Sequence, residues 1–187
     1  MTPRTLLDFL HIAEKLKSNM RHSETSDGVP ENVAAHSWRL CLFAYSLKDE
    51  FPDIDIDKVI KMCIIHDLGE SLTGDIPSFN KTEDDSKIEF EKTTAMFRAF
   101  PAPIGTEFAE LYVEMENLST REARLYKALD KLEAVIQHNE ADISSWLPLE
   151  YELNQTYGYE QTAEFPFLKA LRDEMLKDTL AKIENSK

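Results

Sequence analysis

The chain has 187 residues, a formal net charge of −14, five glycines and two cysteines. This length is typical of one domain that buries a core without disulfides, and so few glycines argue against a Gly-rich phosphate loop or a many-turned β fold. The acidic excess argues against a nucleic-acid polymer as partner, because phosphate backbones are bound by an excess of Lys and Arg, although a small anion can bind where a cation reverses the local field.

Helical spacing of apolar residues runs through most of the chain and predicts an all-α fold. Residues 3–17 predict a helix that faces the core, because apolar residues recur there at helical spacing: Leu6, Phe9, Leu10, Ala13 and Leu16. Residues 18–30 are polar and do not continue this periodicity. They predict a loop, which would lie just before the next helix.

A long second helix is predicted over residues 31–51, where it ends before Pro52. His36 shares the inward face of this helix with Leu40. A buried histidine taken alone is more often a hydrogen-bonded core residue than a metal ligand. The role of His36 therefore depends on which other residues lie near it.

The stretch from residue 61 to residue 76 carries the strongest chemical signal. An apolar helix ends here at His66 and Asp67, and Glu70 follows four residues after the histidine. On a helix these three side chains lean toward one hollow. Adjacent His and Asp residues can both reach one divalent cation, and a carboxylate one turn later can lie beside a metal-bound water. A lone His-Asp pair, however, is more often a hydrogen-bonded cap.

The turn at residues 73–77 and the polar residues that follow it up to Ser86 predict a loop beside the His-Asp pair. Asp75 either caps this turn, which is the usual role of Asp after Gly, or belongs to the pocket. Lys81 either contacts a phosphate or is an exposed, solvated side chain.

Three further helices are predicted before residue 141. Two of them cover about residues 85–100 and 104–117, with prolines between them. Ser119 and Glu122 predict a capping box for the third helix, which carries Asp130.

Residues 141–164 have no clear periodicity and predict a capping loop or a dimer contact, before a last helix at about residues 165–183. The expected organisation is one domain over residues 1–187. Its core would cover about residues 10–140, and a C-terminal capping loop and helix about residues 141–187.

Cys41 and Cys63 lie in apolar helical stretches without C-x-x-C spacing, which predicts free buried thiols. No apolar run approaches the length of a membrane span, and the first residues lack a signal-peptide pattern. We therefore expect a cytoplasmic protein with no membrane partner.

His36 and Asp130 both have apolar neighbours, among which an imidazole or a carboxylate is costly unless it is paired or metal-bound. Together with the His66-Asp67 pair they give the order H…HD…D. The surrounding sequence reads E-N-V-A-A-H-S at residues 31–37, H-D-L-G-E-S-L-T-G-D-I-P at residues 66–77 and D-K-L at residues 130–132. Over roughly residues 10–140 it resembles the HD-domain metal-dependent phosphohydrolases, and among them the 5′-deoxynucleotidase branch, which shows E-S-V-A-E-H-S, H-D-x-x-E-x-x-x-G-D-I-P and D-K-L.

The resemblance implies an HD-type helical bundle with a mononuclear metal site. The implied metal ligands are His36, His66, Asp67 and Asp130. The implied catalytic residues are Glu70 and Asp67, and the implied substrate contacts are Arg21, Asp75 and Lys81. The family often has R-x-G-W where this chain has Met20-Arg21-His22-Ser23, so an exposed, solvated Arg21 stays an alternative.

No histidine lies between Asp67 and Asp130, the interval from which two-metal relatives recruit extra histidines, so we expect one divalent ion. Two imidazoles and two carboxylates leave two of six coordination positions open. This suits Mn²⁺ or Co²⁺ better than a closed tetrahedral zinc site. Purified protein can also carry Mg²⁺, Zn²⁺, Ni²⁺ or Fe²⁺.

The resemblance implies release of phosphate from 5′-(deoxy)nucleoside monophosphates through a metal-activated water, and a homodimer. Two alternatives stay open. One is a hydrolase of another small phosphate ester or of a pyrophosphate, and the other is a non-catalytic HD-fold module that binds a metal or a nucleotide. Metal analysis together with a phosphate-release screen separates them.

Overall fold

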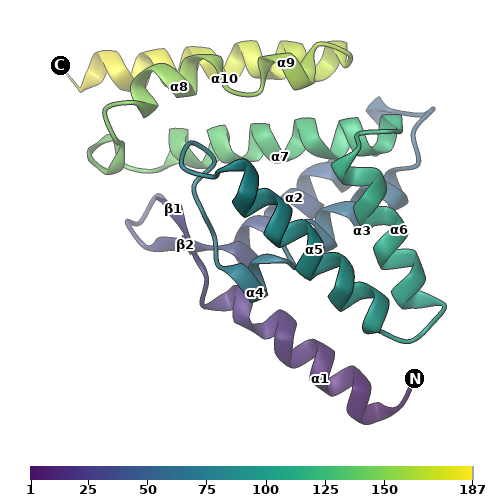
Figure 1. Cartoon of the computed structure of the whole chain (residues 1–187). Helices are drawn as coiled ribbons and strands as arrows, with labels where there is room; N and C mark the ends of the chain where they lie inside the picture. Colours follow the sequence, from purple (N-terminus) through teal and green to yellow (C-terminus); the bar gives the residue numbers. More distant parts are fainter. Residues whose placement is uncertain (187) are drawn as a thin grey trace.

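The computed structural model describes residues 1–186 and is built almost wholly of helices, as predicted (Figure 1). The α-helices are α1 (Pro3–Glu14), α2 (Val33–Ser46), α3 (Ile56–Ile65), α4 (Glu70–Thr73), α5 (Glu83–Ala99), α6 (Ile104–Glu116), α7 (Arg121–Glu140), α8 (Glu150–Thr156), α9 (Tyr159–Thr162) and α10 (Pro166–Asn185). Short 3-10 helices are η1 (Lys15–Lys17), η2 (Lys48–Glu50) and η3 (Ile143–Ser145), and one hairpin is formed by β1 (Met20–Glu24) and β2 (Pro30–Asn32). The expected all-α class is confirmed.

The centre of the fold is the packing of α2, α3 and α7 against one another. Their facing side chains are fully buried, among them Leu40, Met62 and Leu129, and burial of this kind is the main stabilising contribution to a helical bundle. Helices α5 and α6 pack against each other and α6 against α3 and α7, while α8, α9 and α10 form a layer over α7 (Figure 1). Helix α7 therefore lies between the core and the C-terminal layer.

Residues 18–30, expected as a loop, contain strand β1 and the start of an antiparallel ribbon with β2. Gly28, with φ of +73°, lies in the turn that joins the strands, where its amide donates to the carbonyl of Thr25. The ribbon is tied to α7, because Gln137 Nε2 donates to the Glu24 carbonyl. This long-range contact has no signature in the local sequence, and the prediction of a loop was wrong for this reason.

Helix α1 forms as predicted and packs against the core through Phe9 and Ala13, but two of the residues expected on its core-facing side stay exposed. Leu6 and Leu10 are 39% and 51% exposed. The contact with the rest of the protein runs through Phe9, whose ring lies 4.4 Å from that of Phe100, measured between centroids. Helical spacing identifies a helix, but it does not say which neighbour covers the apolar face.

Two predictions of helix ends need correction. Helix α2 ends at Ser46 and is followed by η2, instead of continuing to residue 51. The N-cap of α7 is Thr120, whose Oγ1 accepts from the amide of Ala123, so the predicted Ser119 capping box is wrong. Glu122 falls one residue short of the position that a capping box requires, and its carboxylate accepts from the Asp55 amide instead.

Residues 141–164, expected as a capping loop or a dimer contact, contain α8 and α9, whereas the last helix, α10, was predicted nearly to its ends. Helix α8 has seven residues, which is too few to show a periodicity in the sequence. Cys41 and Cys63 are free thiols, as predicted, but only Cys63 is buried, and Cys41 is partly exposed. Within the described residues, no helix combines the length and the apolar character needed to cross a membrane.

Candidate active site

Three separate helices bring the four predicted metal ligands together. His36 lies on α2, His66 follows the end of α3, Asp67 is the next residue, and Asp130 lies on α7. The two Nε2 atoms are 3.2 Å apart. Asp130 Oδ1 lies 3.3 Å from His36 Nε2, and Asp67 Oδ2 lies 2.9 Å from His66 Nε2. The side chains converge on one point in the middle of the bundle.

The hydrogen bonds of the two imidazoles fix which nitrogen faces this point. His66 Nδ1 donates to the carbonyl of Cys63 at 2.8 Å, and His36 Nδ1 donates to the carboxylate of Glu133. In the neutral tautomers that these acceptors select, both Nε2 atoms carry lone pairs. Two lone pairs and two carboxylate oxygens aimed at one another repel unless a cation lies between them. The residues present therefore fit a divalent metal ion.

The charges of this cluster are consistent with a cation site. Burial alone would raise the pKa of Asp67, but His66 and His36 outweigh it and hold that pKa below its usual range. Burial likewise opposes ionisation of Asp130, and Lys127 and His36 keep its pKa well below normal. Burial and Arg21 lower the pKa of His36, yet Asp130 and Glu133 raise it to about 9. Without metal, the site attracts a proton to His36.

Glu70 opens α4, one short turn after Asp67. Its Oε2 is buried and has no hydrogen-bond partner within residues 1–186. Burial, and then the charges of Asp67 and Asp75, raise its pKa to about 10. Glu70 therefore holds a proton at neutral pH in the metal-free protein. An unpartnered buried carboxyl group beside a metal cluster is suited to proton transfer.

The local backbone holds Glu70 in place through two neighbours. Asn19 Nδ2 donates to the Glu70 carbonyl at 2.6 Å. Gly69 packs so closely against α5 that a Cβ atom there would overlap Thr93 Oγ1. A larger residue at position 69 would push the start of α4, and Glu70 with it, away from α5.

The predicted substrate residues also reach this region. Arg21 extends from β1, with NH1 3.7 Å from Asp67 Oδ2 and its buried Nε 3.2 Å from Glu31 Oε2. Burial disfavours its charge, but Asp67 and Glu133 raise the pKa of Arg21 above its ordinary value. Lys81 is likewise paired, with Glu89 Oε2 at 2.6 Å, so a phosphate would compete with a carboxylate for either cation.

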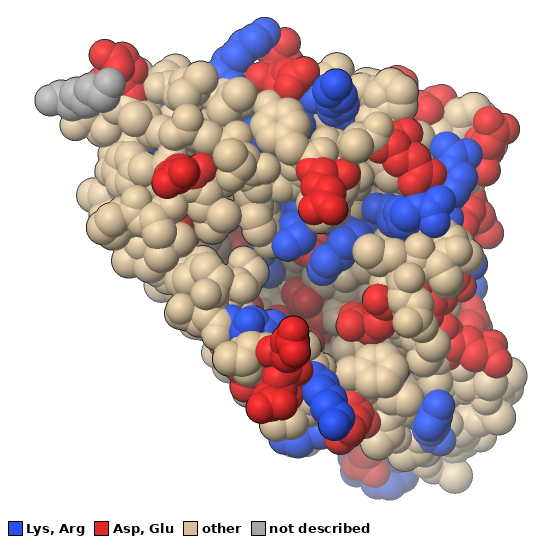
Figure 2. Space-filling view, turned by 45° about the horizontal axis from the view of Figure 1, so that its top comes forward, with Lys and Arg blue, Asp and Glu red and all other residues tan. Residues whose placement is uncertain are grey.

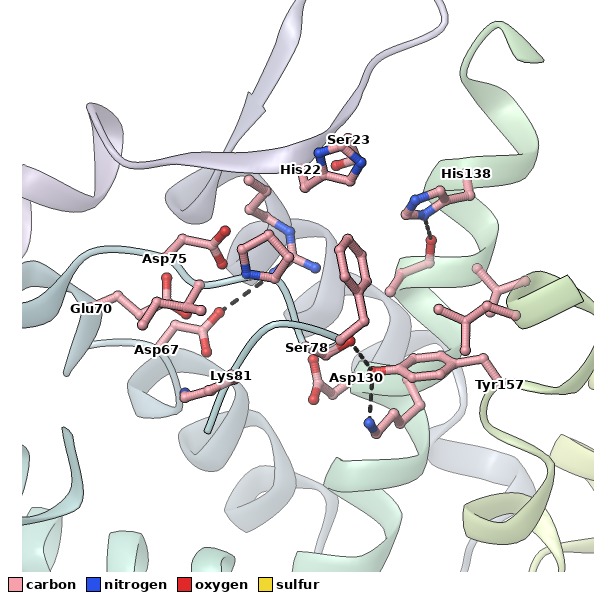
Figure 3. Close-up of a pocket in the computed structure, with 18 of the residues that line it drawn as sticks. His22, Ser23, Asp67, Glu70, Asp75, Ser78, Lys81, Asp130, His138 and Tyr157 are labelled. Atoms are coloured by element: carbon pink, nitrogen blue, oxygen red, sulfur yellow. Dashed lines mark hydrogen bonds and ion pairs between the residues drawn. The ribbon is translucent and has the colours of Figure 1, made fainter. Parts of the chain in front are cut away.

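A cavity of about 410 Å³ opens onto the cluster, a volume within the range of small-molecule sites. Of the predicted residues it is lined by Arg21, Asp67, Glu70, Asp75, Lys81 and Asp130 (Figure 3). His36 and His66 lie buried behind them. Figure 2 shows a hollow with acidic side chains inside and with both basic and acidic side chains around its rim. A small anion could reach a cation held at its base.

Asp75 lines this cavity instead of only capping its turn. The preceding Gly74 has φ of +82° and ψ of 160°, a conformation that is essentially restricted to glycine. This explains why a glycine precedes Asp75, because Gly74 turns the chain and directs the aspartate to the cavity wall.

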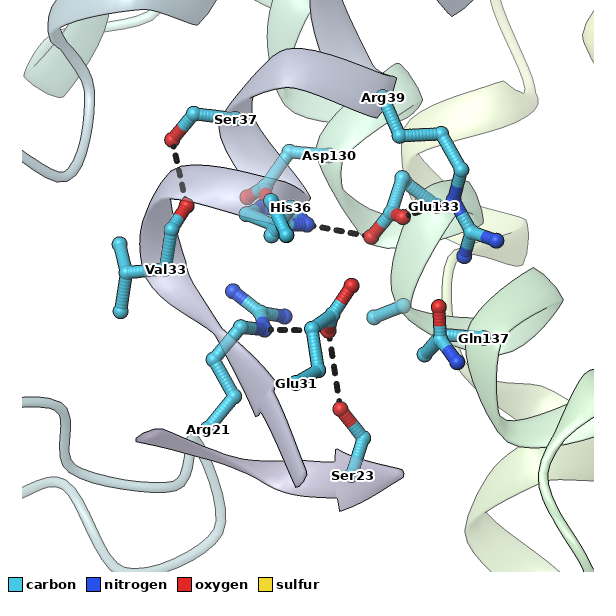
Figure 4. Close-up of polar contacts among 12 residues, drawn as sticks. Arg21, Ser23, Glu31, Val33, His36, Ser37, Arg39, Asp130, Glu133 and Gln137 are labelled. Carbon is cyan, nitrogen blue, oxygen red and sulfur yellow. Dashed lines mark hydrogen bonds and ion pairs between the residues drawn. The ribbon is translucent and has the colours of Figure 1, made fainter. Parts of the chain in front are cut away.

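Two residues of the site were not predicted, although both lie on α7 three residues from Asp130. Glu133 accepts from His36 on one oxygen and from Arg39 Nε on the other (Figure 4). Lys127 Nζ lies 2.9 Å from Asp130 Oδ2, so one oxygen of Asp130 is held while the other faces the histidines. Residues three apart on a helix lie on the same side, so Lys127 and Glu133 could have been predicted from the sequence as neighbours of Asp130.

Comparison with known proteins places this geometry in a family. The HD domain family profile matches residues 13–170. The 5′-deoxynucleotidase HDDC2 of Dictyostelium discoideum is 34% identical over 141 residues, which cover 70% of this chain and 74% of the relative. The human protein of the same name is 31% identical over 141 residues, covering 73% of this chain and 68% of the relative.

A solved structure has the same fold. It is the crystal structure of a predicted metal-dependent phosphohydrolase from Magnetospirillum magnetotacticum. The TM-score is 0.79 at 24% identity, and the superposition covers 96% of this chain and 93% of the other.

Proposed function

Because the chain belongs to the HD domain family, we propose that it is a metal-dependent phosphohydrolase that releases phosphate from 5′-deoxynucleoside monophosphates. The observation that carries this proposal is the convergence of His36, His66, Asp67 and Asp130 at the base of a cavity that is also lined by Glu70, whose carboxyl oxygen Oε2 is buried and unpartnered among the described residues. The relatives named 5′-deoxynucleotidase support the choice of substrate.

In this proposal His36, His66, Asp67 and Asp130 hold one divalent ion. When bound, this ion supplies a Lewis acid that makes a water nucleophilic and neutralises phosphoryl charge. Mn²⁺ and Co²⁺ are our proposed ions, since two imidazoles and two carboxylates leave positions open in a six-coordinate shell. The softer thiolate ligands that favour closed zinc sites are absent from this cluster of described residues.

The chain's own residues then position the phosphate and move protons. Arg21 binds the non-bridging phosphate oxygens with the guanidinium nitrogens that face Asp67. Asp67 orients the attacking water, whose proton passes to a phosphate oxygen as the new phosphorus–oxygen bond forms. Glu70 gives its proton to the 5′ oxygen as the phosphorus–oxygen bond breaks, so the products are a nucleoside and phosphate. Asp75 fixes the substrate from the cavity wall.

A phosphate-release screen tests this function. The substrates are the 5′-deoxynucleoside and 5′-ribonucleoside monophosphates, the triphosphates and the cyclic nucleotides, each with Mn²⁺, Co²⁺ or Mg²⁺ and with a chelator. We expect turnover of the deoxynucleoside monophosphates with Mn²⁺ or Co²⁺ and none with chelator. Turnover of other phosphate esters alone would contradict the proposed substrate. Metal-loaded protein without any turnover would contradict the proposal that the protein is an enzyme.

We also propose that the chain forms a homodimer through an apolar stripe on α2. Trp38, Leu42 and Tyr45 follow helical spacing there and are 65%, 48% and 61% exposed, and Ile64 on the neighbouring α3 is 55% exposed. A contiguous apolar surface of this kind is typical of a protein interface. Trp38→Glu should convert a dimer to a monomer in light scattering, whereas Leu7→Glu on α1 should not.

A further inference from the structure

Helix α8 forms one wall of the cavity. Glu150, Leu153 and Asn154 of this helix and Tyr157, which directly follows its end, all line the cavity, and their spacing of three, four and seven places them on one side. Figure 3 shows Tyr157 on the opposite side of the cavity from Glu70, Asp67 and Asp75, with Asp130 between. A substrate whose phosphate lies at the metal ligands would therefore extend its other end toward α8.

This wall is held rigidly at both ends of the helix. At its start, Glu150 Oε1 lies 2.9 Å from His138 Nε2 on α7, and Oε2 accepts from the Leu147 amide at 2.7 Å. At its end, the fully buried Arg172 of α10 donates from NH2 to the Asn154 carbonyl at 2.6 Å and from Nε to the Tyr157 carbonyl at 2.9 Å. Residues on a backbone fixed in this way are suited to specific recognition.

Asn154 is the unusual member of the wall. It is only 4% exposed, and its Nδ2 is buried without a hydrogen-bond partner within residues 1–186. Buried side-chain amides are nearly always paired, so an unpaired one calls for a ligand or a bound water. Because Asn154 lines the cavity, a ligand in the cavity can satisfy it. A carboxamide offers a donor and an acceptor side by side.

Aromatic rings surround the same end of the cavity. Phe79, from the loop after Asp75, lies against His22 of β1, with centroids 5.7 Å apart and planes at 88°. The Tyr157 hydroxyl accepts from Lys131 Nζ at 2.6 Å and donates to Ser78 Oγ at 3.3 Å, which joins the Phe79 loop to α8. Flat apolar surfaces beside an unpaired amide match a planar heteroaromatic ring.

We propose that this end of the cavity is a nucleobase subsite, in which the Asn154 carboxamide pairs with the donor–acceptor edge of the base and Phe79 packs against its face. The inference rests on the proposed function for the placement of the phosphate. It adds that α8, which lies outside the H…HD…D motif, gives the site its preference for a nucleotide over a sugar phosphate that lacks a base.

Binding of nucleosides tests the subsite without requiring turnover. Isothermal titration of the metal-loaded protein with deoxyadenosine, deoxycytidine, deoxyguanosine and thymidine gives each Kd. In Asn154→Leu we expect the tightest of these to weaken about tenfold, the loss of one hydrogen bond. Gln155→Leu is the matched control, because it removes a carboxamide from the same helix at a position that does not line the cavity. Equal affinities in wild type and Asn154→Leu would overturn the subsite.

Kinetics provide a second readout that separates the subsite from the proposed activity. The ratio of kcat/KM for a deoxynucleoside monophosphate to that for 2-deoxyribose 5-phosphate should fall about tenfold in Asn154→Leu and stay constant in Gln155→Leu. A wild-type ratio near one would overturn the subsite while leaving the phosphohydrolase intact. Nucleoside binding without hydrolysis would overturn only the activity. If Asn154→Leu does not fold, Asn154→Asp keeps the shape and removes the amide donor.

Discussion

Glu133 and His36 form a fully buried pair in which the carboxylate, 1% exposed, accepts from Nδ1 of the imidazole. Arg39 Nε donates to the other carboxylate oxygen at 2.6 Å. Glu133 thus selects the tautomer that presents His36 Nε2 to the metal cluster. Burial opposes the charge of Glu133, but His36, and then Arg39, lower its pKa below the usual value.

Glu133→Gln should therefore weaken metal binding about 10- to 100-fold, because a neutral amide neither selects the tautomer as firmly nor makes the imidazole as basic. Titration of the metal-free protein with Mn²⁺ or Co²⁺ measures the affinity. Glu140→Gln is the control, since Glu140 contacts Arg39 at its exposed end and does not reach His36. Unchanged affinity in Glu133→Gln would show that the pair is only structural.

Glu70→Gln should keep the metal ion and lose turnover. The substitution preserves the shape of the side chain and removes the proton that the raised pKa of about 10 holds at neutral pH. Loss of a general acid lowers kcat by roughly 100- to 10,000-fold. Metal content by mass spectrometry and phosphate release are measured on the same sample. Undiminished phosphate release would remove Glu70 from the mechanism.

The sequence was informative about the centre of the site for a physical reason. His36 and Asp130 lie on regular helices, and His66 and Asp67 follow directly on the end of another, so their spacing and order already indicate which side chains can converge. Asn154 could not be found in this way. It lies on a seven-residue helix, and its significance depends on the absence of a partner among the described residues, which is a property of tertiary packing alone.

The hairpin and α1 also depend on tertiary packing that cannot be predicted from the local sequence. The strand β1 that carries Arg21 is stabilised by its ladder with β2 and by contacts with α7, and neither is encoded in local periodicity. The Leu6 and Leu10 spacing identified a helix correctly, but only the three-dimensional arrangement shows that these side chains stay exposed.

Gly69→Ala should destabilise the protein by about 1–3 kcal/mol, because the added methyl group overlaps Thr93 Oγ1 on α5. Since Glu70 follows directly, we also expect kcat to fall while metal binding persists. The double variant Gly69→Ala/Thr93→Ala removes the overlapping hydroxyl and should regain part of both losses. Denaturant unfolding and kinetics check this, and an unchanged midpoint in the single variant would mean that α4 and α5 separate without cost.

The contact between His138 and Glu150 should make stability depend on pH. Burial lowers the pKa of His138, but the bond to Glu150 outweighs it, and the folded pKa lies above 6.5. This stabilisation is fully present below about pH 6.5 and is lost as the pH rises through the folded pKa. Burial raises the pKa of Glu150, but His138 and the Leu147 amide lower it below 4.5. That contribution is present above about pH 4.5 and is lost as the pH falls through the folded pKa.

The pair therefore stabilises the fold most between about pH 4.5 and pH 6.5. His138→Gln should lower the free energy of unfolding by about 1–2 kcal/mol in this window, and by less above neutral pH. His22, whose Nε2 lies 3.5 Å from Glu150 Oε1, is present in both proteins, so the difference between wild type and variant isolates His138. Urea unfolding at half-unit pH steps measures it, with His11→Gln on exposed α1 as control. A difference that is constant with pH would mean that His138 is neutral throughout and that its bond to Glu150 carries no charge.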